Sequence, residues 1–137
     1  MRSKRKSFVI IFIFFFAVMI GSGCAQKKEE QGKKVEFTVV EFEDIPMALK
    51  EIIDEKKEEP FKLSYGDEGY LYIVQGYGMQ TGGGYSITVD ELSETENNLY
   101  ICTSLIGPDG EKKKKGETYP YIVVKTEYME KDVLYEP

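Results

Sequence analysis

The sequence of 137 residues contains no histidine and no tryptophan, and it has only two cysteines, Cys24 and Cys102. The absence of histidine excludes catalytic triads and metal sites that depend on an imidazole. Two cysteines are too few for a cysteine-ligated zinc site, and no EF-hand calcium loop is present. We therefore expect a protein that is not an enzyme and that holds no cofactor and no metal ion.

Arginine is confined to the start of the chain, where a basic segment contains Arg2, Lys4, Arg5 and Lys6. The apolar run Phe8–Ile20 follows. As a helix this run would reach about 20 Å, whereas the hydrocarbon core of a membrane is about 30 Å thick. A basic segment followed by a short apolar run is typical of a secretory signal peptide, which we assign to residues 1–23.

The residues Gly21, Ser22 and Gly23 before Cys24 resemble the lipobox of bacterial lipoproteins. In that family the signal is cleaved before the cysteine, whose sulphur then carries a lipid. The resemblance implies a chain lipidated at Cys24 and anchored to the cell membrane on its extracytoplasmic face, or to the outer membrane of a Gram-negative organism. Gly21 departs from the pattern, which usually has an aliphatic residue there. The alternative is an ordinary cleaved signal beside a coincidental cysteine.

Removal of residues 1–23 leaves 14 basic and 24 acidic residues, a net charge of about −10, because the signal takes 4 of the 18 basic residues and no acidic ones. A surface with this charge repels phosphate backbones. The charge therefore argues against a nucleic-acid partner.

The rest of the chain divides into a polar tether and one domain. Residues 24–34 are charged and lack apolar periodicity, which predicts a flexible tether. Residues 35–137 have the length of one modest domain. The alternation of Val35–Phe42 predicts a first strand with Val35, Phe37 and Val39 on one face.

One helix is predicted at about residues 45–58. Asp44 is the expected N-cap, and Pro46 fits the first turn, where its missing N–H costs nothing. The apolar residues recur at helical spacing and form one stripe, made of Ile45, Leu49, Ile52 and Ile53. The acidic and lysine-rich end of this segment is interpreted as a solvated helix tail.

After Pro60 the sequence changes to short runs rich in aromatic and β-branched residues, separated by turn residues. This pattern predicts an α+β domain, mainly an antiparallel β sheet or sandwich with one amphipathic helix packed on it. Cys102 lies in one of these runs, Leu99–Ile106, which favours a small buried residue.

The segment Gly78–Val89 places three consecutive glycines before a strand-like run. It is not a phosphate-binding loop, because no Lys-Ser/Thr and no helix follow Gly84. Two interpretations stay open: a hairpin connection, or a loop that contacts another protein. In the second, Tyr85 is the anchor and Gly82–Gly84 permit close backbone approach. The proposed contact residues are Gly78, Gln80, Thr81, Gly82, Gly83, Gly84 and Tyr85.

A second candidate loop follows the next strand-like run. Pro108, Asp109 and Gly110 have the chemistry of a type I turn. The lysine run Lys112–Lys115 comes next and is interpreted as the solvated tip of a hairpin, or alternatively as a local basic spot for an acidic partner or anionic lipid.

These elements, in this order, resemble the PrcB C-terminal domain family, which is named after a lipoprotein subunit of a spirochaete surface protease complex. The resemblance covers about Gly69–Lys125. It rests on the loop residues above, then on Pro108 and Gly110, and finally on Thr118, Pro120 and Tyr121. Gln80 stands where the family often has proline, and one glycine of the loop is extra.

The resemblance implies a non-enzymatic, membrane-tethered module that binds another protein and assists or stabilises a secreted protease complex. Two alternatives stay open. One is a direct protease inhibitor, since the loop is also similar to the Thr-Gly-Tyr/Phe loop of chagasin-type inhibitors. The other is a structural lipoprotein of the envelope with no link to a protease.

Overall fold

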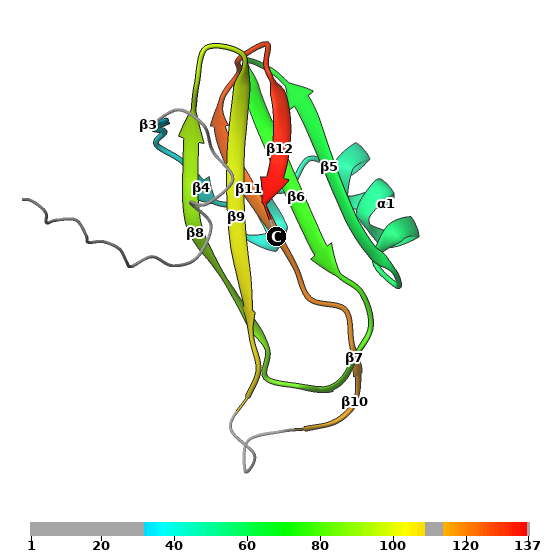
Figure 1. The fold of residues 1–137 in the computed structure, drawn as a ribbon. Coiled ribbons are helices and arrows are strands. Elements are labelled where there is room, and N and C mark those ends of the chain that lie inside the picture. The colour runs from blue at the N-terminus through cyan, green and yellow to red at the C-terminus, as the bar shows by residue number, and fades with distance from the viewer. Residues whose placement is uncertain (1–31, 109–113, 137) are drawn as a thin grey trace, which may run out of the picture. The chain divides into compact units, whose positions relative to one another are not determined.

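The computed structural model describes residues 32–108 and 114–136, which form one helix, one 3-10 segment and ten strands (Figure 1). The 3-10 segment is Phe42–Asp44 and the helix α1 is Met47–Lys56. The strands are β3 (Lys33–Lys34), β4 (Thr38–Val39), β5 (Pro60–Asp67), β6 (Tyr70–Tyr77), β7 (Gln80–Gly83), β8 (Ser86–Glu94), β9 (Asn98–Ile106), β10 (Lys114–Thr118), β11 (Tyr121–Glu127) and β12 (Asp132–Glu136).

Eight of these strands form two four-stranded sheets. Sheet I has the order β4-β11-β6-β5, and sheet II has the order β12-β9-β8-β3. All neighbours are antiparallel except β12, which pairs with β9 in parallel. The predicted fold class, a mainly antiparallel α+β sandwich with one helix, is confirmed.

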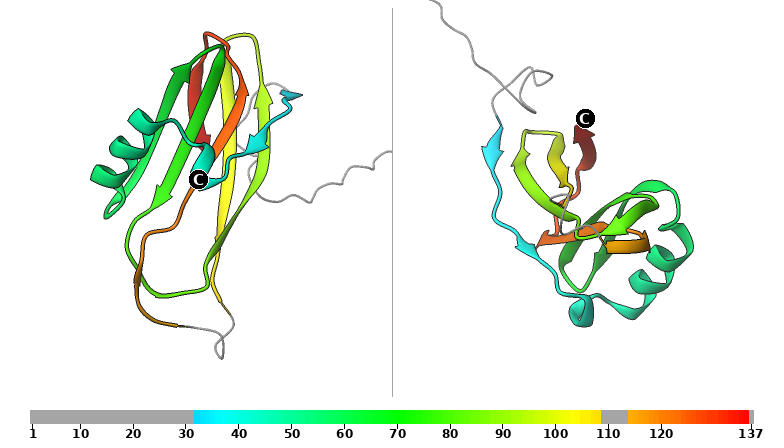
Figure 2. Two further views of the ribbon diagram at one scale, coloured as in Figure 1. Left: turned by 180° about the vertical axis from the view of Figure 1, so that it is seen from behind. Right: turned by 90° about the horizontal axis from the view of Figure 1, so that it is seen from below.

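The domain has three layers, because sheet I is covered on both faces. One core lies between the sheets and contains Leu71, Ile73, Leu92, Leu99, Ile101, Ile122 and Val124. The other lies between sheet I and α1 and contains Ile45, Leu49, Ile53, Tyr72, Val74 and Val123. Alternate residues of β6 therefore serve both cores, and Figure 2 shows α1 on the face of sheet I opposite sheet II.

The helix forms where its apolar stripe predicts it, but two residues shorter at each end. Leu49 and Ile53 are buried on sheet I, and burying such a side chain contributes about 2 kcal/mol. The expected N-cap is wrong. Asp44 ends the 3-10 segment, where its N–H donates to the Glu41 carbonyl at 2.9 Å, and Pro46 takes the N-cap position without a side-chain cap.

The predicted strand at Val35–Phe42 is also wrong in extent. The chain instead makes β3 on the edge of sheet II and β4 on the edge of sheet I, each of two residues. The Val35 N–H donates to the Leu92 carbonyl, and the Val40 N–H donates to the Val123 carbonyl. Because this segment crosses from one sheet to the other, Phe37 and Val39 stay exposed instead of sharing a buried face with Val35. The tether, predicted to end at residue 34, already pairs with β8 at Lys33.

The remaining two strands form a separate antiparallel ribbon, β7-β10. It lies beyond the ends of the two sheets: β7 is part of the connection from β6 to β8, and β10 leads into β11 (Figure 1). The hairpin predicted after β9 lies partly outside the described residues, and its described part, β10, pairs with β7 and not with β9.

Candidate functional site

The glycine-rich segment forms one end of the domain. β6 ends at Tyr77, the chain passes through Gly78 and β7, and β8 begins at Ser86. Gly78 lies against the start of β5: a Cβ atom added to it would be 2.9 Å from Pro60 Cδ. The Met79 N–H donates to the Glu58 carbonyl at 3.2 Å, which ties the segment to the chain that follows α1.

The three consecutive glycines have different surroundings. Gly82 and Gly84 have φ angles of 88° and 90°, a left-handed conformation that favours glycine. Gly82 and Gly83 are buried, whereas Gly84 is exposed. The Thr118 hydroxyl of β10 donates to the Gly82 carbonyl at 2.7 Å, and Gly83 pairs with Lys114. The close backbone approach at Gly82 and Gly83 is therefore that of the domain's own β10.

Tyr85 is half-buried at the end of this segment. Its hydroxyl donates to the Thr81 carbonyl at 3.3 Å, so the side chain folds back over the glycines. Its ring also lies beside Gly107, where an added Cβ atom would be 3.5 Å from Tyr85 Cε1. The ring therefore connects the glycine-rich segment with Gly107, the residue that follows β9.

The structure pairs the first predicted loop with β10, which begins within the lysine run that follows the second predicted loop. Gln80 and Thr81 of β7 pair with Thr118 and Glu117 of β10. Pro108 is half-buried, whereas Asp109, Gly110, Lys112 and Lys113 lie outside the described residues. We call the surface formed by the half-buried Tyr85 and the exposed residues Thr81, Gly84, Lys115 and Glu117 the ribbon surface.

Three polar side chains near the ribbon end of the domain, those of Gln75, Tyr77 and Thr103, form a hydrogen-bonded group that the sequence did not predict. The Tyr77 hydroxyl donates to Thr103 Oγ1 at 2.5 Å, and the Thr103 hydroxyl donates to Gln75 Oε1 at 3.0 Å. These bonds join β6 of sheet I to β9 of sheet II beneath the ribbon. The only sequence signal for this link between the sheets was a threonine, Thr103, at an alternating strand position. That signal does not distinguish a buried hydroxyl from an exposed one.

The chain enters the described domain at the opposite end of β8. β3 pairs with Glu94 and Ser93, at the last residues of β8, whereas Tyr85 directly precedes its first residue, Ser86. A strand of this length covers about 25 Å. The N-terminal end and the ribbon surface are thus separated by the length of sheet II (Figure 1).

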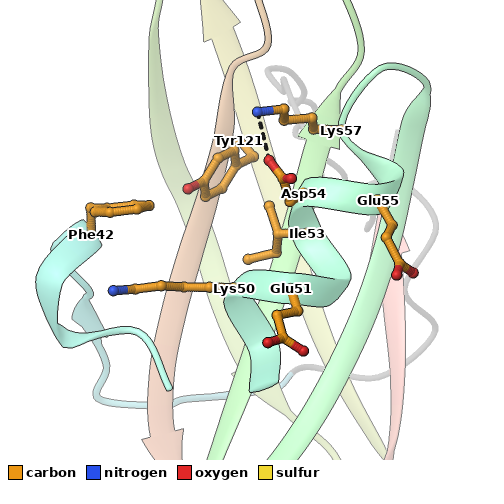
Figure 3. Close-up of a pocket in the computed structure, with 8 residues that line it drawn as sticks. All are labelled: Phe42, Lys50, Glu51, Ile53, Asp54, Glu55, Lys57 and Tyr121. Carbon is orange, nitrogen blue, oxygen red and sulfur yellow. Dashed lines mark ion pairs between the residues drawn. The ribbon is translucent and has the colours of Figure 1, made fainter. Parts of the chain in front are cut away.

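A cleft on the outer side of sheet I was also missed. It has a volume of about 510 Å³, and it lies between Phe42, Tyr121 and one side of α1. Figure 3 shows Tyr121 between Phe42 and Ile53 in this view, with Lys50 reaching below the Phe42 ring. The Lys50 ammonium lies 4.4 Å from the centre of that ring, a cation–π contact.

The charges in this cleft are partly paired. Lys57 Nζ lies 2.8 Å from the Asp54 carboxylate, and this hydrogen bond raises the pKa of Lys57. Burial raises the pKa of the Tyr121 hydroxyl, so its ring presents a neutral wall at pH 7. The sequence signal for the cleft was Phe42, an apolar residue between two glutamates, which was assigned to the end of the predicted strand Val35–Phe42.

Neither a metal site nor a membrane-spanning helix occurs among the described residues. Across residues 32–108 and 114–136, no group of three or more histidine, cysteine, aspartate or glutamate side chains is arranged to hold a metal ion. Within the same residues, no helix has the length and apolar character needed to cross a membrane. Cys102 is buried in β9 as expected, and Cys24 lies outside the described residues.

These features define a small helix-covered β-sandwich domain with a two-stranded ribbon at one end. Its strands β6 to β11 match the model of the PrcB C-terminal family over residues 71–127, and this segment belongs to that family. The family assignment made from the sequence is confirmed, with slightly shifted bounds. The match does not extend to chagasin-type inhibitors. No curated protein and no solved structure was found to match the chain.

Proposed function

We propose that this chain is a membrane-tethered, extracytoplasmic lipoprotein whose domain binds another protein and has no enzymatic activity. The ribbon surface is the contact site, and Cys24 carries the lipid. The family's namesake, a lipoprotein subunit of a surface protease complex, supports a secreted protease or its complex as the partner. In that role the domain assists or stabilises the complex.

The observation that carries this proposal is the placement of the ribbon surface at the end of β8 opposite β3. A tether that leads from Cys24 to Lys33 would reach the domain at the β3 end. The ribbon surface then points away from the membrane, where a partner outside the cell can reach it.

The same end also carries exposed apolar side chains. Met79, just before β7, is 46% exposed, and Ile106, at the end of β9, is 47% exposed. Interfaces combine such apolar side chains and tyrosines with a polar rim. Thr81, Lys115 and Glu117 supply the polar groups here.

Photo-cross-linking in the intact organism tests the contact site. A photoreactive residue replaces Thr81 or Lys115 in the full-length chain, and the matched controls carry it at Glu96 or Glu130, which are exposed at the β3 end. We expect a covalent adduct with one extracytoplasmic protein from Thr81 and Lys115 and no adduct from the controls. The same adduct from both ends of the domain, or from the controls alone, contradicts the proposal.

Mass spectrometry of the adduct then decides the kind of partner. A protease or a protein bound to one supports the protease-complex role, and proteolysis assays with and without the chain distinguish assistance from inhibition. A structural envelope protein in the adduct would refute the protease link.

The lipid anchor is tested separately, with Cys24→Ser in the full-length chain. We expect wild type to incorporate a labelled fatty acid and to stay in the membrane fraction, and Cys24→Ser to incorporate none. Equal labelling of the two chains would refute lipidation at Cys24, whatever the cross-linking shows.

A further inference from the structure

We propose a second protein-binding site in the cleft between the 3-10 segment, α1 and Tyr121. Its ligand is an extended segment of a protein partner in which one bulky apolar side chain is flanked by lysine or arginine. The apolar side chain enters the cleft, and the basic side chains meet the acidic surface around it.

The cleft has the shape and lining that an apolar side chain needs. Phe42 and Tyr121 form two aromatic walls, Ile53 also lines the cleft, and the cleft volume is about 510 Å³ (Figure 3). Binding pockets in proteins are commonly lined by aromatic and apolar side chains and have volumes of about 300–1,000 Å³.

The aromatic wall at Phe42 is unusually open to solvent for its residue type. Phe42 is 62% exposed, and Met47 at the start of α1 is 69% exposed. Neither side chain belongs to the core clusters on either face of sheet I. Phe42 lines the cleft, and Met47 belongs to the helix that forms one side of it. Large apolar side chains that stay exposed near a cleft are typical of a surface that another molecule covers.

The charge of the surrounding segment identifies the partner as basic. Residues 41–59 contain eight acidic residues and three lysines, a net charge of −5, which is half of the net charge of about −10 carried by residues 24–137. All eight acidic residues are exposed: Glu41, Glu43, Asp44, Glu51, Asp54, Glu55, Glu58 and Glu59. Such a local field attracts a basic segment and repels an acidic one.

The lysines of the cleft do not cancel this field. Lys57 is held by Asp54, and Lys50 lies against the Phe42 ring. Among the described residues, no ion pair involves Glu51 or Glu55, which extend from α1 on the side away from Phe42 (Figure 3). These two carboxylates are therefore positioned to pair with basic side chains that flank an apolar residue in the cleft.

This site is independent of the ribbon surface, because it uses neither Tyr85 nor the ribbon strands. Loss of one site can therefore be recognised while the other remains intact. Cross-linking from Thr81 and Lys115 tests the ribbon proposal. Peptide binding to variants of Phe42, Glu51 and Glu55 tests the cleft proposal.

Three labelled pentapeptides serve as probes: KKFKK, KKGKK and EEFEE. Fluorescence anisotropy measures their binding to the full-length chain in a non-ionic detergent, with empty micelles as the blank. We expect KKFKK to bind about tenfold more tightly than KKGKK, the effect of one well-buried aromatic side chain, and EEFEE not to bind. Equal binding of KKFKK and KKGKK, or no binding of KKFKK, overturns the proposal.

Two pairs of variants locate the binding. Phe42→Ser is compared with Tyr128→Ser, which removes an exposed aromatic side chain at the β3 end. The double variant Glu51→Lys, Glu55→Lys is compared with Glu96→Lys, Glu130→Lys, which changes the net charge equally at a distance. All these positions are exposed, so the fold should be preserved, and circular dichroism verifies it.

We expect each cleft variant to weaken KKFKK binding about tenfold or more, and each control to change it less than about twofold. The proposal is overturned if Glu96→Lys, Glu130→Lys weakens KKFKK binding as strongly as Glu51→Lys, Glu55→Lys does. The attraction would then be a property of the whole surface and not of the cleft. Unchanged binding in Phe42→Ser overturns the proposal as well.

Discussion

The side chain of Phe61 in β5 lies across Gly76 in β6, its pairing partner. A Cβ atom added to Gly76 would be 2.2 Å from Phe61 Cε1, closer than two such atoms can approach. We expect Gly76→Ala to lower the free energy of unfolding by about 1–3 kcal/mol, because the ring has to move out of its place against sheet I. Urea denaturation measures the change.

Gly66→Ala in β5 is the matched control. Its added Cβ atom would be 3.2 Å from Cε1 of Tyr128, an exposed side chain that can move aside. We expect the control to stay within about 1 kcal/mol of wild type, since alanine also restricts the unfolded chain. Equal destabilisation by the two substitutions would show that the Phe61 contact is not the cause.

We expect the buried hydroxyl of Tyr135 in β12 to make the free energy of unfolding fall at alkaline pH. Its hydroxyl donates to the Leu63 carbonyl of β5 at 2.8 Å, and burial raises its pKa above the ordinary value of 10.0. The folded state therefore keeps the proton when the unfolded state loses it. The resulting stability is complete below about pH 10 and is lost as the pH rises toward the raised pKa.

Replacement by phenylalanine separates the two effects of this hydroxyl. We expect Tyr135→Phe to lower the free energy of unfolding at pH 7 by about 1 kcal/mol, for one lost hydrogen bond, and to flatten its decline above pH 10. Denaturation at several pH values checks both. A decline as steep as that of wild type would assign the alkaline sensitivity to other tyrosines, such as Tyr121, whose pKa burial also raises.

At the scale of elements, the helix could be predicted from local signals, whereas the pairing of distant strands could not. The stripe of Leu49 and Ile53 was enough to predict α1, because a helix satisfies its hydrogen bonds within its own sequence. β7 was predicted as a loop, because Gln80–Gly83 has no strand propensity and its partner β10 lies about 30 residues further on. The parallel pairing of β12 with β9 likewise has no local signature.

The candidate sites could likewise be predicted only in the parts that depend on neighbouring residues in the sequence. The glycine triplet and Tyr85 could be identified as a candidate contact loop from their composition and from the family resemblance. Burial of Gly82 and Gly83 was not foreseen, because it depends on the hydroxyl of Thr118 in another strand. The cleft was not foreseen either, because Tyr121 reaches it from a strand more than 60 residues after α1.

The segment after β11 contains an ion pair, between Lys131 and Glu94, that we expect to be sensitive to acid. Lys131 Nζ lies 2.5 Å from the Glu94 carboxylate at the end of β8 and donates to the Thr95 carbonyl at 2.7 Å. This hydrogen bond lowers the pKa of Glu94 below its ordinary value of 4.5. The ionised form is thus favoured by folding, so its stabilisation is present above about pH 4.5 and is lost as the pH falls through the lowered pKa.

We expect Lys131→Met to lower the free energy of unfolding at pH 7 by about 1 kcal/mol and to reduce its decline between pH 5 and pH 3, a range that brackets the ordinary carboxyl pKa. Lys57→Met is the matched control, since it also removes a lysine from an ion pair but touches neither Glu94 nor Thr95. An acid profile altered equally by both variants would contradict the assignment to Glu94.

At the scale of the whole domain, residues 32–40 tie the two sheets together. The Val35 N–H bonds to Leu92 of sheet II at 3.0 Å, the Val40 N–H bonds to Val123 of sheet I at 2.9 Å, and the Thr126 hydroxyl donates to the Glu36 carbonyl at 2.8 Å. The segment lies on the edges of β8 and β11. It therefore covers backbone groups that would otherwise be free to pair with another chain.

A comparison of two shortened chains tests this role. We expect a chain that begins at residue 32 to be monomeric. We expect a chain that begins at residue 41 to be less stable by about 2–4 kcal/mol, because it loses the three hydrogen bonds above and the pairing of β3 and β4, and because two sheet edges are uncovered. The shorter chain should also self-associate in size-exclusion chromatography, because strand edges pair with each other. If it remains monomeric and unfolds at the same urea concentration, residues 32–40 belong to the tether and the domain begins at the 3-10 segment.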